Sequence, residues 1–526
     1  MSRIRIQIYA FILIFVFANP GVSTAQDFPF KLAGIFGDHM VLQRDRPIPI
    51  WGWGKVGSKV SIKLGTTETA TTVDSDGKWL AELTAMPAGG PYELTVTQLG
   101  QSLNRSDILI GEVWLCSGQS NMAMTVSRCQ DFDNEKSLAN IPSIRMMTVA
   151  KNASPDIELD CKGAWEIASP DTVGSFSGTA WFFGRKLHEE LDVPIGLINS
   201  SWGGTDVAAW TSLKVQKSNP NLNAKFEAYE STVKNYDEEK SNQRFEKSLA
   251  DWLQKKKNNE KVGRRPRKPI NPLVNQNRPS NLFNGMIHPL IPYGIRGAIW
   301  YQGERNSKTI ASGELYEVQL KTMIQDWRSR WQIGDFPFLA VQLPNFKKPQ
   351  QAATENSGWV MLRESQMNTL ELPNTGLAVT TDVGMANDIH PKNKQAVGNR
   401  LALWALGTTY EKSIVFSGPL YSSVQFSQNH QSIGKCQVKF KHIGKGLKTS
   451  DGQPIRGFAV AGNDKIFHSA QADLGPQGKT LIISSDQVLE PAAVRYNWKN
   501  NPDGNLVNSA DLPAAPFRTD DWKIED

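Results

Sequence analysis

Four short polar segments carry residue types that can perform nucleophilic acyl chemistry. The segments are Gly118–Met122, Ser201–Thr205, Gln302–Asn306 and Asp388–Pro391. A serine nucleophile requires a base, a group that orients this base, and donors for the oxyanion. Histidine has an ordinary pKa of about 6.5, so His390 can remove the proton of Ser120 at neutral pH. These residues favour hydrolysis of an ester by a serine, a reaction that requires no metal ion and no cofactor.

The oxyanion donors are expected from three of the same segments. Backbone N–H groups of Ser120 and of Gly203 or Gly204 can converge on one oxygen. The side-chain amide of Asn306 can join them. Glycine suits positions 203 and 204 because a side chain there would block the approach of the acyl group. Each segment alone is weak evidence, since a serine in this setting often caps a helix and a Gly-Gly pair often marks a tight turn.

The elements that would position these segments are strands that alternate with helical stretches. Predicted strands cover Ile108–Leu115, Val193–Ile198, Gly297–Tyr301, Phe338–Gln342 and Gly376–Thr380. Phe183, Leu187 and Leu191 recur at helical spacing between the first two strands. Such alternation is typical of a parallel α/β sheet with helices on both faces, which places its sites at the carboxyl ends of the strands. We therefore expect the first three segments to meet at one edge of the sheet.

The regions on either side of this α/β domain have a different pattern. In residues 26–106, apolar and polar residues alternate around Ile62, and Asp76-Gly77 has the chemistry of a hairpin turn. This predicts a small β-sandwich-like domain. Similar alternation predicts a β-rich domain over residues 411–526, so that the α/β domain spans residues 107–410.

Residues 213–270 interrupt the α/β domain with two predicted amphipathic helices. Apolar residues recur at three- and four-residue steps around Tyr229 and again around Leu249. Between Lys214 and Lys268 there are 15 Lys and Arg against eight Asp and Glu, so the insert is basic. A solvated helical insert explains this charge, and a surface that binds a polyanion is the alternative.

The composition indicates a globular protein of several domains. The chain has 526 residues, is 40% hydrophobic and 21% charged, and has a formal net charge of +6. This charge is small for the length and argues against a nucleic-acid partner. The four cysteines lack Cys-x-x-Cys spacing, which argues against a structural zinc site, and Cys129 with Cys161 is a possible disulfide pair.

The first 25 residues have the pattern of a secretory signal peptide. Arg3 and Arg5 precede an apolar run from Ile6 to Ala18, and small residues lead to an expected cleavage site after Ala25. The apolar run is shorter than the roughly 20 residues that span a bilayer. We therefore expect an exported protein, periplasmic or secreted, with no membrane anchor after cleavage.

The polar segments resemble the signature blocks of the sialate O-acetylesterase family, within the SGNH (GDSL-like) hydrolase superfamily of serine esterases. The matching blocks are Gly111–Met122 (GEVWLCSGQSNM), Asn199–Thr205 (NSSWGGT), Trp300–Asn306 (WYQGERN) and Asp388–Lys394 (DIHPKNK). The resemblance covers residues 27–410 and implies a three-layer α/β/α domain with a parallel sheet. It implies that Ser120 is the nucleophile and His390 its base, and that the glycine of the second block and Asn306 are oxyanion donors. It also implies that the protein removes O-acetyl groups from a carbohydrate substrate without a cofactor.

The sequence departs from the family pattern near the expected site. The superfamily usually has Asp three residues before the histidine, where this chain has Asn387, and Asp388 stands one residue later. Either Asp388 orients the imidazole or a backbone carbonyl holds it in a Ser–His dyad. Arg305 and Ala208 also differ from the family pattern, at places where they can alter the choice of substrate. The residues predicted to contact substrate or to support the catalytic groups are Gln119, Asn121, Gln302, Glu304 and Arg305.

Three other functions remain open from the sequence. The hydrolase can act on acetylated plant polysaccharide, xylan or xyloglucan, rather than on sialic acid, because both present an acetyl ester on a hydroxyl. A carbohydrate-binding protein with a degenerate esterase core is the second alternative, since Asp is absent at position 387. A metal hydrolase that uses Asp382, Asp388 and His390 is the third.

Overall fold

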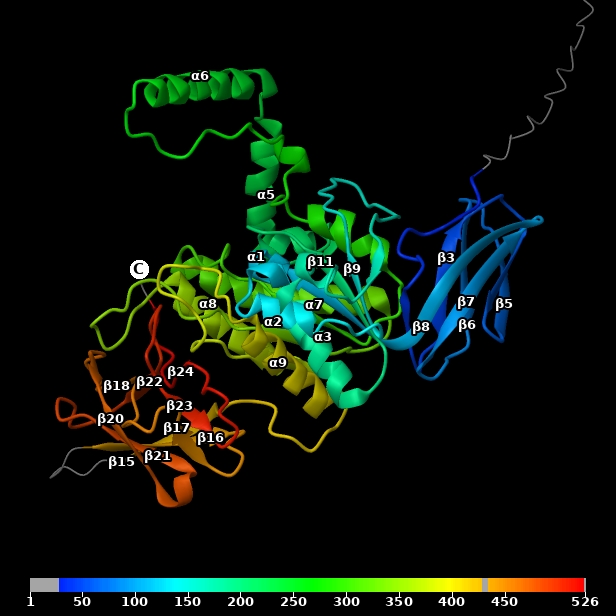
Figure 1. Cartoon of the computed structure of the whole chain (residues 1–526). Helices are drawn as coiled ribbons and strands as arrows, with labels where there is room; N and C mark the ends of the chain where they lie inside the picture. Colours follow the sequence, from blue (N-terminus) through cyan, green and yellow to red (C-terminus); the bar gives the residue numbers. More distant parts are fainter. Residues whose placement is uncertain (1–27, 428–433, 525–526) are drawn as a thin grey trace, which may run out of the picture.

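The computed structural model describes residues 28–427 and 434–524, so the predicted signal peptide lies outside the described residues (Figure 1). Its centre is a mixed sheet with the strand order β10-β9-β11-β8-β12-β13-β14. These strands are β8 (Gln101–Gly118), β9 (Ile144–Thr148), β10 (Trp165–Ile167), β11 (Ile195–Ser201), β12 (Gly297–Tyr301), β13 (Phe338–Val341) and β14 (Thr375–Ala378). All neighbours on this path are parallel except β10, which pairs antiparallel with β9 at one edge.

Helices cover both faces of the parallel strands. These helices are α3 (Gly178–Leu191), α7 (Ile310–Trp331), α8 (Gly358–Met367) and α9 (Lys394–Trp404). Ile299 and Tyr301 of β12 share a hydrophobic cluster with residues of α3 and α9. Ala298 and Trp300, which alternate with them, share a second cluster with residues of α7 and α8. Burial on both faces explains why these strands appear in the sequence as nearly continuous apolar runs.

The five strands predicted from the sequence are confirmed, but β8 begins at Gln101, seven residues before its predicted start at Ile108. β8 and β11 continue three residues beyond the predicted strands, and their polar ends remain paired because Ser201 lies opposite Gly118 in the parallel ladder. β9 and β10 were not predicted. The carboxyl ends of β8, β11 and β12 lie side by side, as expected for the first three polar segments.

The amino-terminal part is all β and joins the central sheet through β8. It contains β1 (Lys31–Leu32), β2 (Val41–Gln43), β3 (Ile48–Trp53), β4 (Lys59–Leu64), β5 (Thr67–Thr72), β6 (Lys78–Leu83) and β7 (Gly89–Gln98). The first half of β8 pairs with β7, and the second half pairs with β11 and β12. The expected domain boundary at residues 106 and 107 therefore falls inside one continuous strand. The change of partner occurs at Gly111, where a Cβ atom would lie 2.0 Å from the carbonyl oxygen of Pro194.

The carboxyl-terminal part is also all β, as expected. Its strands are β15 (Leu420–Ser427), β16 (Lys435–Lys441), β17 (Leu447–Thr449), β18 (Phe458–Ala461), β19 (Phe467–Ser469), β20 (Gln471–Leu474), β21 (Thr480–Ser484), β22 (Ala493–Tyr496), β23 (Leu506–Asn508) and β24 (Phe517–Arg518).

The buried guanidinium of Arg363 in α8 joins this part to the α/β core. It donates hydrogen bonds to the carbonyl oxygens of Leu343, Pro344, Lys499 and Asn500.

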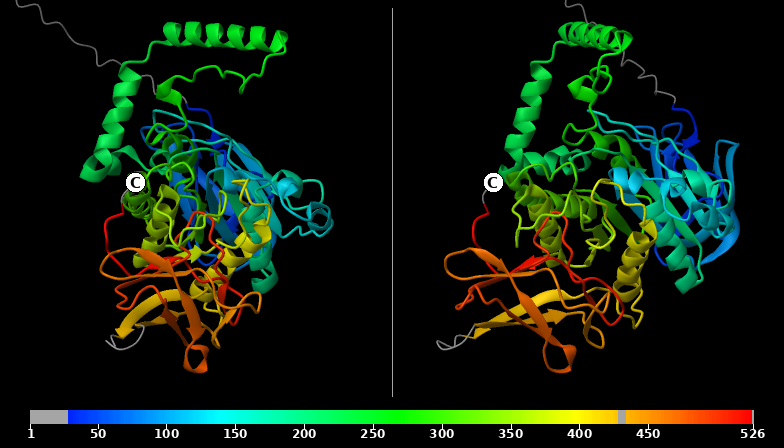
Figure 2. Two further views of the ribbon diagram at one scale, coloured as in Figure 1. Left: turned by 90° about the vertical axis from the view of Figure 1, so that its left-hand side faces the viewer. Right: turned by 60° about the vertical axis from the view of Figure 1, so that its left-hand side comes forward.

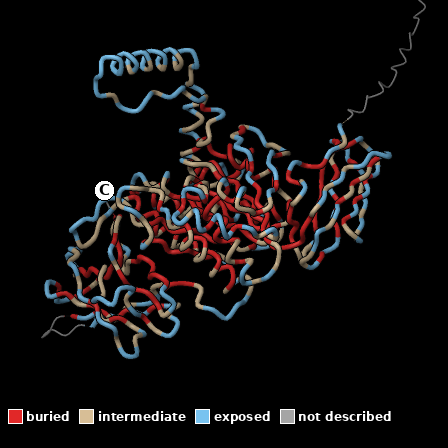
Figure 3. The backbone as a smooth tube through the Cα atoms, viewed as in Figure 1, coloured by how far each residue is buried: buried red, intermediate tan, exposed pale blue. Residues whose placement is uncertain are grey.

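The insert forms three helices, one more than predicted, of which the last leaves the body of the protein. They are α4 (Leu213–Ser218), α5 (Pro220–Lys234) and α6 (Glu238–Lys257). α5 buries Leu222 and Phe226, whereas no residue of α6 is buried. Figure 2 shows α6 standing apart from the rest of the chain, and Figure 3 shows its surface as almost wholly exposed. Among the described helices, none has the length and apolar character needed to cross a membrane.

All four cysteines are unpaired and buried, so the possible disulfide between Cys129 and Cys161 is absent. The physical reason is that the two thiols lie in different hydrophobic clusters. Cys129 belongs to the cluster that contains α3 and α9, and its thiol is a donor to the carbonyl oxygen of Thr125. Cys161 belongs to the cluster shared with the amino-terminal strands.

A buried ion cluster stabilises the point at which β8 changes its partners. The Glu112 carboxylate is fully buried and accepts hydrogen bonds from Arg44 at 2.6 Å and from Arg296 at 2.7 and 3.0 Å. Burial opposes ionisation of this carboxyl, but Arg296 and Arg44 outweigh burial and hold its pKa below the usual range. Glu112 thus links the amino-terminal part to the loop before β12.

We predict that Glu112→Gln lowers the free energy of unfolding by about 3 kcal/mol, because it leaves two arginines without their buried counter-charge. Unfolding in urea, followed by tryptophan fluorescence, measures this loss. Glu82→Gln on the exposed face of β6 is the matched control and should change stability by less than about 0.5 kcal/mol. A loss below about 1 kcal/mol for Glu112→Gln would contradict the role given to this cluster.

Candidate active site

Ser120 begins a short helix directly beyond the carboxyl end of β8. This helix is α1 (Ser120–Ala123), and Ser120 is partly exposed. Gly118, the last residue of β8, has a φ of 141°, and a Cβ atom there would lie 2.2 Å from the carbonyl oxygen of Tyr301. Only glycine fits this turn without a clash. The strand can therefore turn sharply and leave the serine at the edge of the sheet.

The second predicted segment lies directly against Ser120. A Cβ atom on Gly203 would be 3.3 Å from Cβ and 3.5 Å from Cα of Ser120, and the Trp202 N–H donates to the carbonyl oxygen of Gly118 at 3.0 Å. Within residues 28–427 and 434–524, the backbone N–H groups of Ser120, Gly203 and Gly204 donate to no protein acceptor. The structure thus brings Gly203 against Ser120 and leaves the N–H hydrogens of Ser120, Gly203 and Gly204 available.

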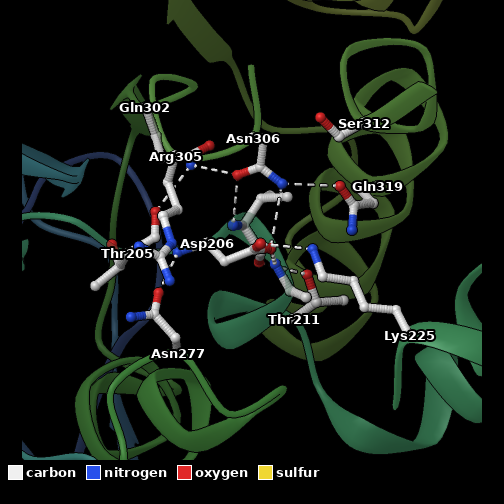
Figure 4. Close-up of polar contacts among 12 residues, drawn as sticks. Thr205, Asp206, Thr211, Lys225, Asn277, Gln302, Arg305, Asn306, Ser312 and Gln319 are labelled. Atoms are coloured by element: carbon white, nitrogen blue, oxygen red, sulfur yellow. Dashed lines mark hydrogen bonds and ion pairs between the residues drawn. The ribbon is translucent and has the colours of Figure 1, made fainter. Parts of the chain in front are cut away.

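Asn306, the fourth predicted donor, is engaged elsewhere. Its Nδ2 donates to Asp206 Oδ1 at 3.2 Å and to Gln319 Oε1 at 3.1 Å, so both amide hydrogens are used (Figure 4). Its Oδ1 accepts from Gln302 Nε2 at 2.8 Å and from the N–H of Val207 at 3.3 Å. The expected role of Asn306 as an oxyanion donor stays a prediction, and it requires the exchange of one of these bonds.

The same polar network ties α5, the second helix of the insert, to the site. Asp206 follows the Ser201–Thr205 segment directly, and Lys225 of α5 binds its Oδ2 at 2.5 Å (Figure 4). Arg305 is exposed, and its guanidinium makes no hydrogen bond or ion pair with the described part of the chain. Burial raises the pKa of Tyr229 in α5, whereas the charges of Arg278 and Arg305 lower it. Arg305, which departs from the family pattern, therefore lies between the site and the insert.

Two buried glutamines connect the three segments. Gln119 Oε1 accepts from the N–H groups of Gly303 at 3.4 Å and Arg305 at 3.3 Å. Gln302 Nε2 donates to the carbonyl oxygen of Thr205 at 3.0 Å, besides its bond to Asn306. Gln119 is 2% exposed and Gln302 is 0% exposed. These two predicted site residues therefore hold the loops together and are too buried to meet a substrate directly.

His390 and Asp388 lie together, but not at hydrogen-bond distance through the ring. His390 Nδ1 is 3.7 Å from Asp388 Oδ1, and this oxygen accepts the backbone N–H of His390 at 2.9 Å. Burial lowers the pKa of His390 below its ordinary 6.5, whereas the Asp388 charge raises it and the charges of Lys394 and Arg128 lower it further. The ring is therefore poised as a neutral base at pH 7.

Asn121 joins the serine segment to the histidine segment. Its Nδ2 donates to the Ile389 carbonyl oxygen at 3.0 Å and to the Glu304 carboxylate. Asn121 is fully buried. Burial raises the pKa of the Glu304 carboxyl, while the Asn121 hydrogen bond and the charge of Lys394 lower it. The structure thus places both residues between the serine and histidine segments, and their supporting role stays a prediction.

Lys394 is a member of this site that sequence reasoning missed. The first residue of α9, it is fully buried, and its Nζ donates to Asn121 Oδ1 and to the Pro391 carbonyl oxygen, both at 2.7 Å. Burial lowers its pKa to about 8. Its place at the end of the Asp388–Lys394 block was the available signal, but lysines are mostly exposed and nothing local predicts the burial of this one.

Asp382, one of the two carboxylates of the metal-hydrolase alternative, is already bound by an arginine. Both oxygens of Asp382 accept hydrogen bonds from Arg400, each at 2.6 Å. In the ranges that the structure describes, no group of three or more His, Cys, Asp or Glu residues is arranged to hold a metal ion. The bidentate contact with Arg400 gives Asp382 a structural partner and separates it from the pair of Asp388 and His390.

Comparisons with known proteins agree with this geometry. A family model described as "Carbohydrate esterase, sialic acid-specific acetylesterase" matches residues 110–260 and 275–406. The sialate O-acetylesterase of Rattus norvegicus is 31% identical over 94% of this chain and 95% of its own length, and that of Homo sapiens is 30% identical over 75% and 74%. The crystal structure of a carbohydrate acetylesterase from Xanthomonas citri has a TM-score of 0.78 and 34% identity, and covers 94% of this chain and 100% of that one. The chain belongs to the sialic acid-specific acetylesterase family of carbohydrate esterases.

Proposed function

We propose that this esterase removes acetyl groups from sugar hydroxyls by serine catalysis, with Ser120 as nucleophile and His390 as base. The observation that carries the proposal is the contact of Gly203 with Ser120, beside three backbone N–H groups that have no protein acceptor in the described ranges. The helices on both faces of the sheet support the three-layer α/β/α arrangement of SGNH hydrolases. The division into domains and the export of the chain remain part of the same proposal.

The proposed reaction proceeds in two acyl-transfer steps. His390 takes the proton of Ser120 as Oγ attacks the acetyl carbonyl, and the resulting oxyanion accepts hydrogen bonds from the N–H groups of Ser120, Gly203 and Gly204. The tetrahedral intermediate collapses, and the sugar oxygen leaves with the proton from His390. A water molecule, deprotonated by His390, then attacks the acetyl-serine and releases acetate. Each preorganised N–H donor contributes about 10²–10³ in rate.

Asp388 is the proposed partner of the imidazole. Its Oδ1 lies 3.7 Å from His390 Nδ1, so a shift of less than about 1 Å would create the hydrogen bond of a Ser–His–Asp triad. Its carboxylate favours the imidazolium that forms during attack, as its effect on the pKa of His390 indicates. Asp388 can therefore assist the reaction by charge even without a direct bond to the ring.

The proposed substrate is an O-acetylated sugar of the sialate type. The relatives named sialate O-acetylesterase cover 75% to 94% of the chain, which favours this substrate. Acetylated plant polysaccharide remains the alternative, since the catalytic segments recognise the acetyl ester that both substrates share. A carbohydrate-binding protein with a degenerate core is disfavoured, because the chain belongs to a family of esterases and retains Ser120 and His390.

We predict that Ser120→Ala lowers the hydrolysis of 4-nitrophenyl acetate by about 10⁴-fold or more, because the nucleophile is removed. Release of 4-nitrophenolate measures the rate. Ser127→Ala, at an exposed serine nearby, is the matched control and should retain the wild-type rate. Treatment with a chelator should also leave the rate unchanged. An active Ser120→Ala variant, or inactivation by chelation, would favour the metal-hydrolase alternative.

We predict faster acetate release from an O-acetylated sialoglycan than from acetylated xylan or xyloglucan. The comparison measures acetate from each substrate at equal concentrations of acetyl ester. Ser120→Ala serves as the blank for spontaneous ester hydrolysis. Faster release from either plant polysaccharide would assign the enzyme to that substrate class instead.

We predict that kcat/KM falls as the pH is lowered, with a midpoint below pH 6.5. His390 must be neutral to accept the serine proton, so activity falls as pH falls through its lowered pKa. Asp388→Asn should move the midpoint to still lower pH, because the carboxylate that raises this pKa is gone. Asp382→Asn is the matched control and should leave the midpoint in place. A wild-type midpoint at or above 6.5 would contradict the assignment of His390.

A further inference from the structure

Lys394 holds the two carbonyl groups that flank His390, one directly and one through Asn121. Its Nζ donates to the Pro391 carbonyl oxygen at 2.7 Å. It also donates at 2.7 Å to Asn121 Oδ1, whose Nδ2 donates to the Ile389 carbonyl oxygen at 3.0 Å. Asn121 follows Ser120 directly in the chain. The peptide carbonyls on either side of His390 are therefore fixed by groups that are attached to the serine segment.

Charges at both ends of the Asn121 carboxamide fix its orientation. The ammonium of Lys394 faces its oxygen, and the carboxylate of Glu304 faces its NH₂ group. Rotation of the amide by half a turn would direct the NH₂ group at the ammonium and the oxygen at the carboxylate, which is repulsive at both ends. Asn121 and Lys394 are fully buried and Oε2 of Glu304 is buried as well, so water screens these interactions little.

Lys394 cannot itself meet a substrate in this arrangement. Two of its three ammonium hydrogens are used by Asn121 and Pro391, and the Nζ atom lies 5.3 Å from the centre of the Tyr301 ring. The side chain is 0% exposed. Its effect on the reaction must therefore pass through the groups that it holds.

We propose that Lys394 is a positioning residue, which sets His390 against Ser120 by clamping the Ile389 and Pro391 carbonyls to the serine segment. The inference rests on the proposed roles of Ser120 and His390 and adds a residue to them. The geometry accounts for a buried lysine whose burial is costly and which makes no ion pair at direct contact distance with any described residue. Without the clamp, the imidazole loses its defined place relative to the serine hydroxyl, and displacements of about 1 Å reduce rates about 100-fold.

The test compares Lys394→Met, which keeps the chain length and removes the donors, with wild type on 4-nitrophenyl acetate. We expect kcat to fall about 10- to 100-fold while KM stays within about twofold, because substrate binding is untouched. Lys394→Arg, which retains the charge and the donors, should recover most of the loss. Lys392→Met is the matched control, since Lys392 is exposed two residues away and should behave as wild type.

A double-mutant cycle distinguishes the clamp from a general structural role. Asn121→Ala removes the link on the serine side. The double variant should lose little more kcat than either single variant, because both substitutions disrupt the same hydrogen-bond network. Thermal unfolding of each variant reports whether it is folded. If Lys394→Met does not fold, the kcat of Asn121→Ala alone tests the clamp. A wild-type kcat in that variant overturns it.

Failure of the clamp can be told from failure of the proposed function. A folded Lys394→Met with wild-type kcat, or multiplicative effects in the cycle, overturns the clamp while Ser120→Ala still abolishes activity. An active Ser120→Ala variant overturns the serine mechanism and the clamp with it. A kcat loss that Lys394→Arg restores, with KM retained and effects that do not multiply, supports the clamp.

Discussion

The parallel pairing of β8 with β11 and β12 is the constraint on which the candidate site depends. In this register Gly118 lies opposite Ser201 on one side and Tyr301 on the other, so the three strands end at one level. The three segments that follow must then share one small volume. Glycine at 118 and at 203 is the consequence, since the backbone of each segment passes within contact distance of the next.

A buried polar layer lies beneath the exposed edge of this site. Gln119, Gln302 and Asn306 fasten the serine, glycine and asparagine segments to one another, while Asn121 and Lys394 reach the histidine segment. Each group in the layer is desolvated and depends on its neighbours for hydrogen bonds, so the layer is stable only when it is complete. Ser120 and His390, the proposed catalytic residues, can stay partly exposed because this buried layer determines their positions.

The sequence predicted the parts of the fold that depend on local pattern. Strands such as Gly297–Tyr301 appear as apolar runs because both faces are covered, and polar segments after them mark the edge of the sheet. Pairings between distant side chains were not predictable in this way. Asn306 was expected to face the oxyanion, but Asp206 and Gln319 take its hydrogens, and each comes from another element. Burial of Lys394 and continuity of β8 through its polar first half also follow only from tertiary contacts.

The shared strand β8 has a consequence for how this protein can evolve. Its first half belongs to the amino-terminal sheet and its second half leads to Ser120, with Glu112 bonded across the junction. A cut between the two would break a strand rather than a linker, so this region cannot be exchanged among proteins as a separate module. The carboxyl-terminal part is joined differently, after α9 and through side-chain contacts such as those of Arg363. Recombination can therefore replace the end of the chain far more readily than its beginning.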